Sequence, residues 1–126
     1  MDRSPLQGAR LVGFVGASDL PRSRAFYEGV LGLTVVEQNP YACVFDVAGT
    51  MLRVTAVPEV VVAAHTVLGW NVDDIDIAVD GLRDRGVTFS RYDGMDQDGR
   101  GIWTAPGGAR IAWFTDPDGH TLSLTG

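Results

Sequence analysis

The chain has 126 residues, a formal net charge of −6, 45% hydrophobic residues and one cysteine. A negative chain does not fit general nucleic-acid binding, and a single cysteine excludes both an internal disulfide and a zinc site built from cysteines. No apolar run is long enough to cross a membrane and no signal-peptide core is visible, so we expect a cytoplasmic protein without a membrane partner.

The first half of the chain reads as a strand, a helix and three further strands. Residues 10–17 form the predicted first strand, and Ser18 and Asp19 follow as helix-capping residues. An apolar stripe between Leu20 and Leu31 predicts the helix, which glycines at 29 and 32 bring to an end. Further strands are expected over residues 33–38, 41–47 and 50–57, each separated from the next by a turn.

The second half repeats this order after a bridge over residues 58–65. A strand over 66–72 is followed by a helix capped by Asp73 and Asp74, with Ile75, Ile77, Val79 and Leu82 expected to face inward. A strand is predicted over 87–92 and an acidic loop over 91–100. The glycine-rich stretch 101–108 is either a loop over a binding site or a hairpin turn beside an edge strand.

The clearest element is a hairpin near the end of the chain, with strands over 110–115 and 121–125. Its turn is Asp116-Pro117-Asp118-Gly119, in which proline fixes φ and glycine closes the turn. The stretch 49–54 resembles 119–124, which indicates that one unit occurs twice. We therefore predict one α+β domain over residues 1–126, in which two βαβββ modules (8–57 and 66–126) form a cupped mixed sheet with the helices outside.

The chain resembles the vicinal-oxygen-chelate superfamily, which includes glyoxalase I, extradiol dioxygenases and bleomycin-resistance proteins. The first half carries Val15-x-x-x-Asp19-Leu20-x-x-Ser23-x-x-Phe26-Tyr27-x-x-x-Leu31-Gly32-Leu33. The second half carries Val72-Asp73-Asp74-Ile75 and Asp116-Pro117-Asp118-Gly119-His120. The resemblance implies paired βαβββ modules whose concave face holds a metal ion or a ligand, and a homodimer, for which residues 60–62 would suit the interface.

Metal-binding members of that superfamily place His or Glu ligands at positions that this chain fills differently. Carried over from the family pattern, the positions are Val12, Arg53, Val67 and Ser123. Valine has no lone pair, arginine brings a positive charge and a lone serine is a weak ligand. We therefore expect no metal ion and no other cofactor, which puts glyoxalase and dioxygenase chemistry in doubt.

Strand alternation predicts which residues line the cup. The positions that share a face with Val12, Arg53, Val67 and Ser123 are mixed in polarity, whereas the opposite face is almost wholly apolar. The helix-facing set is Leu11, Val15, Leu52, Val54, Leu68, Trp70, Val72, Leu122 and Leu124. The predicted ligand-binding residues are Phe14, Met51, Arg53, Asn71, Trp103, Trp113 and Ser123, with Trp113 favoured over Phe114 as the inward residue.

Several of these residues also have a purely structural interpretation. Arg53 either holds a carboxylate or phosphate in fork geometry or forms a salt bridge to Asp46 or Glu37. His65 is interpreted as a linker residue and His120 as a turn residue, not as metal ligands. Cys43 is expected to be a buried small hydrophobe, and the acidic loop lacks the spacing of a calcium loop.

Three functions fit this pattern. The first is a metal-free protein that binds a small, partly aromatic molecule in the cup, as drug-sequestering members do. The alternative is a glyoxalase-like lyase or isomerase, or a dioxygenase-like enzyme, with displaced ligands or no metal; no tuned acid–base pair is visible for it. The third is an interaction module without a small-molecule ligand.

Overall fold

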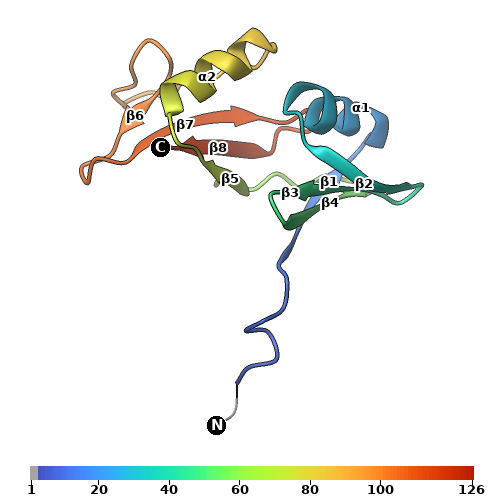
Figure 1. The fold of residues 1–126 in the computed structure, drawn as a ribbon. Helices are drawn as coiled ribbons and strands as arrows, with labels where there is room; N and C mark the ends of the chain where they lie inside the picture. The colour runs from blue at the N-terminus through green and yellow to red at the C-terminus, as the bar shows by residue number, and fades with distance from the viewer. Residues whose placement is uncertain (1–2) are drawn as a thin grey trace. The chain divides into compact units, whose positions relative to one another are not determined.

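The computed structural model describes residues 3–126 and divides the chain between Val60 and Val61 into two compact units. Each unit contains one four-stranded mixed sheet, with strand orders β1-β4-β3-β2 and β5-β8-β7-β6 (Figure 1). The second order is the first shifted by four strands, so the predicted repeat of one βαβββ unit is confirmed. No helix in residues 3–126 is long and apolar enough to span a membrane.

The first unit begins with β1 (Val12–Ala17) and α1 (Leu20–Arg24). The helix starts at Asp19, whose carboxylate accepts a hydrogen bond from the backbone N–H of Arg22 at 3.1 Å, as predicted for an N-cap. It continues as the π-helix η1 (Ala25–Val30) and ends before Gly32, which takes φ +76°. The strands β2 (Thr34–Asn39), β3 (Ala42–Val47) and β4 (Thr50–Ala56) complete the sheet.

The core of the first unit lies between its sheet and its helix. Tyr27 of η1 is fully buried against Phe45 of β3, with ring centroids 5.8 Å apart. Val15, Leu52 and Val54, all predicted to face the helix, are buried. Leu11, also predicted to face the helix, is 75% exposed because β1 begins one residue after it, so that assignment was wrong.

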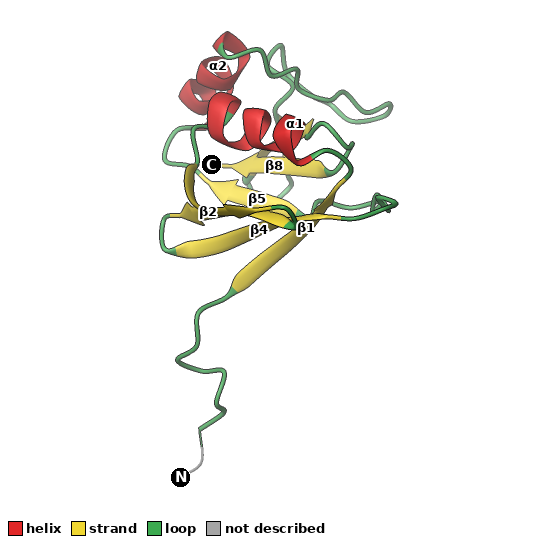
Figure 2. Ribbon diagram, turned by 90° about the vertical axis from the view of Figure 1, so that its right-hand side faces the viewer, coloured by secondary structure: helices red, strands yellow, loops and turns green. Residues whose placement is uncertain are grey.

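The second unit contains β5 (Leu68–Asn71), α2 (Ile75–Asp84), β6 (Trp103–Thr104), β7 (Arg110–Thr115) and β8 (Thr121–Thr125). Asp74 caps α2 by accepting a hydrogen bond from the N–H of Ile77 at 3.1 Å. Figure 2 shows α2 on one side of β8, and this side carries the core. Phe114, Leu122 and Leu124 are buried there, and Phe89 packs on Phe114 with centroids 5.5 Å apart.

Two predictions about the second unit were wrong. Residues 87–92 are not a strand: the edge of β7 pairs with β6, and the segment gives β7 only one backbone bond, from Ser90 N–H to the oxygen of Trp113 at 2.7 Å. Its alternation is real, since Val87 and Phe89 are buried. Ile77 is 70% exposed, because the inward face of α2 is set by Ile75 and Val79, four residues apart.

Both readings of the closing segments are resolved by the hairpins. The turn Asp116–Gly119 forms as predicted, with the N–H of Gly119 donating to the oxygen of Asp116 at 3.0 Å. The stretch 105–108 is the turn between β6 and β7, closed by the N–H of Gly108 on the oxygen of Ala105 at 2.8 Å. Trp103 is therefore an edge-strand residue, and the stretch is a hairpin turn.

Candidate functional site

The face of the second sheet that points away from α2 gathers several of the predicted site residues. Register pairs Trp113 with Ser123 and Ser123 with Gly69, and paired residues share a face. Trp103 pairs with Ile111, two residues before Trp113, so both tryptophans lie on this face. Their ring centroids are 6.2 Å apart. Asn71 shares the face by the same alternation.

A pocket of about 470 Å³ opens beside Trp113 on this face. Tyr92 forms a perpendicular contact with Trp113, with ring centroids 5.5 Å apart and an interplanar angle of 86°. Aromatic and thioether groups form one wall and hydroxyl and imidazole groups another. Besides small alanines, the lining residues are His65, Thr66, Tyr92, Met95, Trp113 and Thr121. Such a mixed lining suits a flat apolar molecule with polar edges.

The loop that carries Tyr92 and Met95 is held by the side chain of Gln97. The N–H of Tyr92 donates to Oε1 of Gln97 at 2.8 Å. Nε2 of Gln97 donates to the carbonyl oxygens of Ser90 at 2.9 Å and of Gly101 at 2.8 Å. The amide thus joins both ends of the loop, which fixes the pocket wall with an ordered backbone.

Ion pairs tie the following part of the chain to α2 on the other side of the sheet. Arg110 of β7 forms two hydrogen bonds with Asp76, at 2.9 and 3.0 Å. Arg100 forms two with Asp80, at 2.9 and 3.0 Å. These bonds lower the pKa of both carboxyls, and they raise the pKa of both guanidinium groups.

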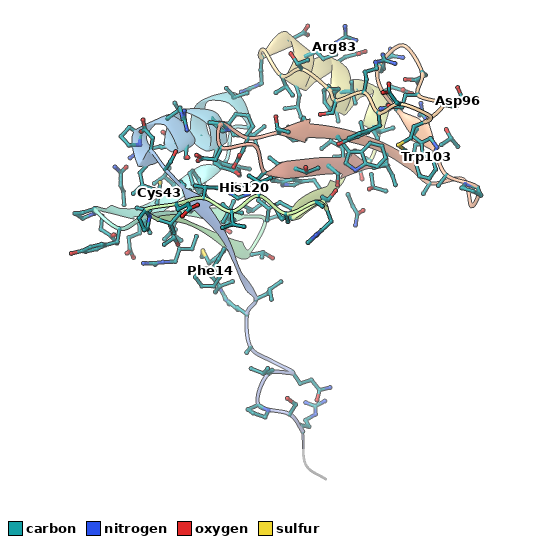
Figure 3. All side chains as sticks on the ribbon, turned by 180° about the vertical axis from the view of Figure 1, so that it is seen from behind. Phe14, Cys43, Arg83, Asp96, Trp103 and His120 are labelled. Atoms are coloured by element: carbon teal, nitrogen blue, oxygen red, sulfur yellow. The ribbon has the colours of Figure 1, made fainter. Side chains whose placement is uncertain are left out.

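The first unit presents the other predicted site residues on its own open face. Phe14 of β1 and Arg53 of β4 are register partners, and Met51 lies two residues before Arg53 on the same face. Figure 3 shows Phe14 projecting from the sheet on the side away from the helix, and its side chain is 65% exposed. Within residues 3–126 Arg53 forms no ion pair, so the predicted salt bridge to Asp46 or Glu37 is not present.

The positions where the superfamily places metal ligands do not provide a metal site here. Val12 and Val67 offer no donor atom, Arg53 offers a cation, and Ser123 offers one hydroxyl that is 93% buried beside Gly69 (7% exposed). In the described part of the chain no three His, Cys, Asp or Glu residues are grouped closely enough to hold an ion. The donor chemistry therefore does not fit the family's divalent ion.

Other candidate residues have structural roles. Cys43 is buried, and burial raises the pKa of its thiol, as expected for a small core residue. The N–H of His120 donates to Oδ1 of Asp116 at 3.0 Å within the hairpin turn. Gln97 and Asp98 use their side chains to fold the acidic loop, where Oδ1 of Asp98 accepts the N–H groups of Arg100 and Ile102.

Sequence reasoning placed only Trp113 among the residues that line the pocket. His65 was assigned to the linker, although its parity with Val67 already puts it on the same face as Gly69. Thr121 shares the face of Ser123 for the same reason. Tyr92 and Met95 carry no such signal, because they sit in an irregular loop whose path depends on Gln97.

Solved structures of similar fold come from several bacteria. A lactoylglutathione lyase from Agrobacterium tumefaciens superposes with a TM-score of 0.70 at 19% identity, covering 97% of this chain and 95% of that one. A glyoxalase/bleomycin resistance protein from Catenulispora acidiphila gives 0.68 at 24% identity, covering 92% and 96%. A glyoxalase/bleomycin resistance protein/dioxygenase from Alicyclobacillus acidocaldarius gives 0.69 at 18%, covering 94% and 90%.

These structures share the fold of this chain, at identities too low to transfer an activity. The family described as Glyoxalase/Bleomycin resistance protein/Dioxygenase superfamily matches residues 11–124, which is nearly the whole chain. The match agrees with the capped helices and the Asp116–Gly119 hairpin on which the resemblance was based. The chain belongs to the Glyoxalase/Bleomycin resistance protein/Dioxygenase superfamily.

Proposed function

We propose that this protein binds a small, partly aromatic molecule in the pocket beside Trp113, without a metal ion at the family's ligand positions. The observation that carries the proposal is the perpendicular pair of Tyr92 and Trp113 in a pocket of about 470 Å³. A planar ligand gains stacking and apolar contact from these rings. Thr66, Thr121 and His65 supply hydrogen-bonding groups for its polar edge.

The metal-free part of the proposal is supported by the donor set. Val12, Val67, Arg53 and Ser123 stand where His or Glu would be needed. Ser123, Asn71 and Trp103 lie on the same face as the pocket and would contact a ligand that extends beyond Trp113. Phe14, Met51 and Arg53 remain predicted contacts on the first unit's own open face.

A thermal-shift and tryptophan-fluorescence screen of natural products and aromatic acids tests the proposal. A ligand that binds the native state should raise the melting temperature saturably. Tyr92→Ala should abolish most of that shift, whereas Tyr41→Ala should leave it unchanged, because Tyr41 is an exposed tyrosine outside the pocket. Equal effects of the two substitutions, or no ligand in the screen, would count against the pocket.

The alternative function is an enzyme, a glyoxalase-like lyase or isomerase. Its support is His65, a general acid or base in the same pocket as two threonine hydroxyls. Elemental analysis of purified protein, together with turnover assays on the screened ligands, separates the two functions. A stoichiometric divalent ion, or turnover lost in His65→Gln but not in His120→Gln, would favour the enzyme.

A homodimer is also proposed for this chain. Val61 is 83% exposed and Val62 48% exposed, which leaves apolar surface for a second copy to cover. Light scattering of the wild type and of a Val61→Ser variant measures the assembly state directly.

A further inference from the structure

A second pocket of the second unit is lined by three arginines. It measures about 360 Å³ and lies between the end of α2 and the loop that follows it. The cationic residues are Arg83, Arg91 and Arg100, and the rest of the lining is Val87, Thr88, Phe89 and Gly99. Because Phe89 packs on Phe114, this pocket is on the α2 side of the sheet, opposite the pocket beside Trp113.

The first of these arginines to consider is Arg100, whose charge is already balanced. Its guanidinium donates two hydrogen bonds to Asp80 and lies 3.7 Å from Asp76. Since both carboxylates belong to α2, this arrangement fixes the guanidinium plane against the helix. Arg100 therefore provides an oriented wall of the pocket with little excess charge.

Arg91 differs from Arg100 because its partners are neutral. Its guanidinium donates to the carbonyl oxygen of Gly99 at 2.9 Å and to that of Gln97 at 3.5 Å. Carbonyl oxygens orient a guanidinium without cancelling its charge. No carboxylate pairs with Arg91 among residues 3–126.

Arg83 adds a second uncompensated charge from the last turn of α2. It is exposed, and its electrostatic interaction is with Asp80, whose two oxygens already accept from Arg100. Within the described residues it has no ion pair, including with its neighbour Asp84. Two guanidinium groups without carboxylate partners thus face one pocket, although the chain as a whole carries −6.

We propose that this arginine pocket, lined by Arg83, Arg91 and Arg100, binds a phosphate group, either free or carried by a small organic molecule. The three guanidinium groups and the Thr88 hydroxyl offer more donors than the two oxygens of a carboxylate can accept. A phosphate has three acceptor oxygens and close to two negative charges, which matches the two uncompensated arginines. The site is separate from the proposed aromatic-ligand pocket and does not depend on it.

Titration followed by amide NMR at constant low ionic strength tests this site, with inorganic phosphate, glycerol 3-phosphate and glycerol as probes. Neither phosphate probe is aromatic, so the response is distinct from that of the Trp113 pocket. Saturable shifts at Thr88, Arg91 and Gly99 are expected with both phosphate probes and none with glycerol. Tighter binding of glycerol 3-phosphate would indicate an organic phosphate, and equal or weaker binding would indicate the free ion.

Substitution of the arginines makes the test specific. Arg83→Ala and Arg91→Ala should each weaken phosphate affinity about tenfold, in line with a lost charge-assisted hydrogen bond of about 1.5 kcal/mol. Arg10→Ala is the matched control, because Arg10 is an exposed arginine outside the pocket. Shifts that do not saturate, or affinities of Arg83→Ala and Arg91→Ala equal to that of Arg10→Ala, would overturn the proposal.

Discussion

The hydroxyl of Ser123 occupies the space that a side chain on Gly69 would need. A Cβ atom built on Gly69 would lie 2.9 Å from Oγ of Ser123, closer than such contacts occur in folded proteins. The two residues are register partners on β8 and β5. A hydroxyl at the family's ligand position is therefore packed over a glycine, which explains why Ser123 is nearly buried on an open sheet face.

The first prediction follows from this contact. Gly69→Ala should destabilise the protein by about 1 kcal/mol, because Ser123 must move to admit the new methyl group. Adding Ser123→Ala should recover part of the loss, which urea denaturation of the single and double variants measures as a coupling energy. Gly81→Ala is the control: nothing lies near its Cβ position in α2, so it should stabilise the helix slightly. Additive effects of the Gly69 and Ser123 substitutions would contradict the steric explanation.

The second prediction concerns the loop held by Gln97. Gln97→Glu keeps the acceptor for the N–H of Tyr92 but removes both donors to the oxygens of Ser90 and Gly101. We expect a loss of about 1 kcal/mol for each bond, together with faster hydrogen exchange at the Tyr92 amide. Affinity for any ligand of the Trp113 pocket should fall as well, because Tyr92 and Met95 lose their fixed positions.

Gln7→Glu serves as the control for that experiment, because Gln7 is exposed in the segment before β1 and its side chain has no printed role in the pocket. It introduces the same charge change without touching the loop. If Gln97→Glu and Gln7→Glu exchange the Tyr92 amide at equal rates, Gln97 does not order the loop.

Much of the fold could be predicted from local chemistry. The caps at Asp19 and Asp74 and the Asp116–Gly119 turn are set by residues within a few positions of each other, so they can be read without tertiary information. Alternation then places Trp113 and Ser123 on one face and Phe114 on the other, because side chains on a strand have a period of two.

What could not be predicted depends on competition between distant segments. Residues 87–92 alternate like a strand, but β6 takes the edge of β7, and no local signal ranks those two partners. The wall of the candidate pocket was missed for a related reason. Tyr92 reaches Trp113 only because Gln97 bonds to backbone groups at both ends of an irregular loop.

The third prediction concerns Cys43, a free cysteine buried on β3. Burial raises the pKa of its thiol, and both the low thiolate fraction and the lack of access should slow its reaction with a disulfide reagent. We expect slow modification of the native protein and rapid modification in urea, followed by absorbance of the released thiol. Rapid modification in native buffer would mean that β3 opens frequently, and the interpretation as an inert core residue would be wrong.

The fourth prediction is a loss of stability in acid from the ion pairs on α2. Hydrogen bonds from Arg110 and Arg100 lower the pKa of Asp76 and Asp80 in the folded state. A carboxyl with a lowered folded pKa binds fewer protons than in the unfolded chain, where its pKa is about 3.9. Its contribution is therefore complete above about pH 4 and is lost as the pH falls through the folded pKa.

Asp76→Asn should consequently be less stable than the wild type at neutral pH, by a small amount because the pair is solvent-exposed, and the difference should shrink as the pH falls below about 4. Urea denaturation across this range measures both free energies of unfolding. Asp96→Asn is the matched control, since Asp96 has no ion pair among the described residues. A gap between wild type and Asp76→Asn that stays constant down to pH values well below the folded pKa would show that Arg110 does not stabilise the ionised form of Asp76.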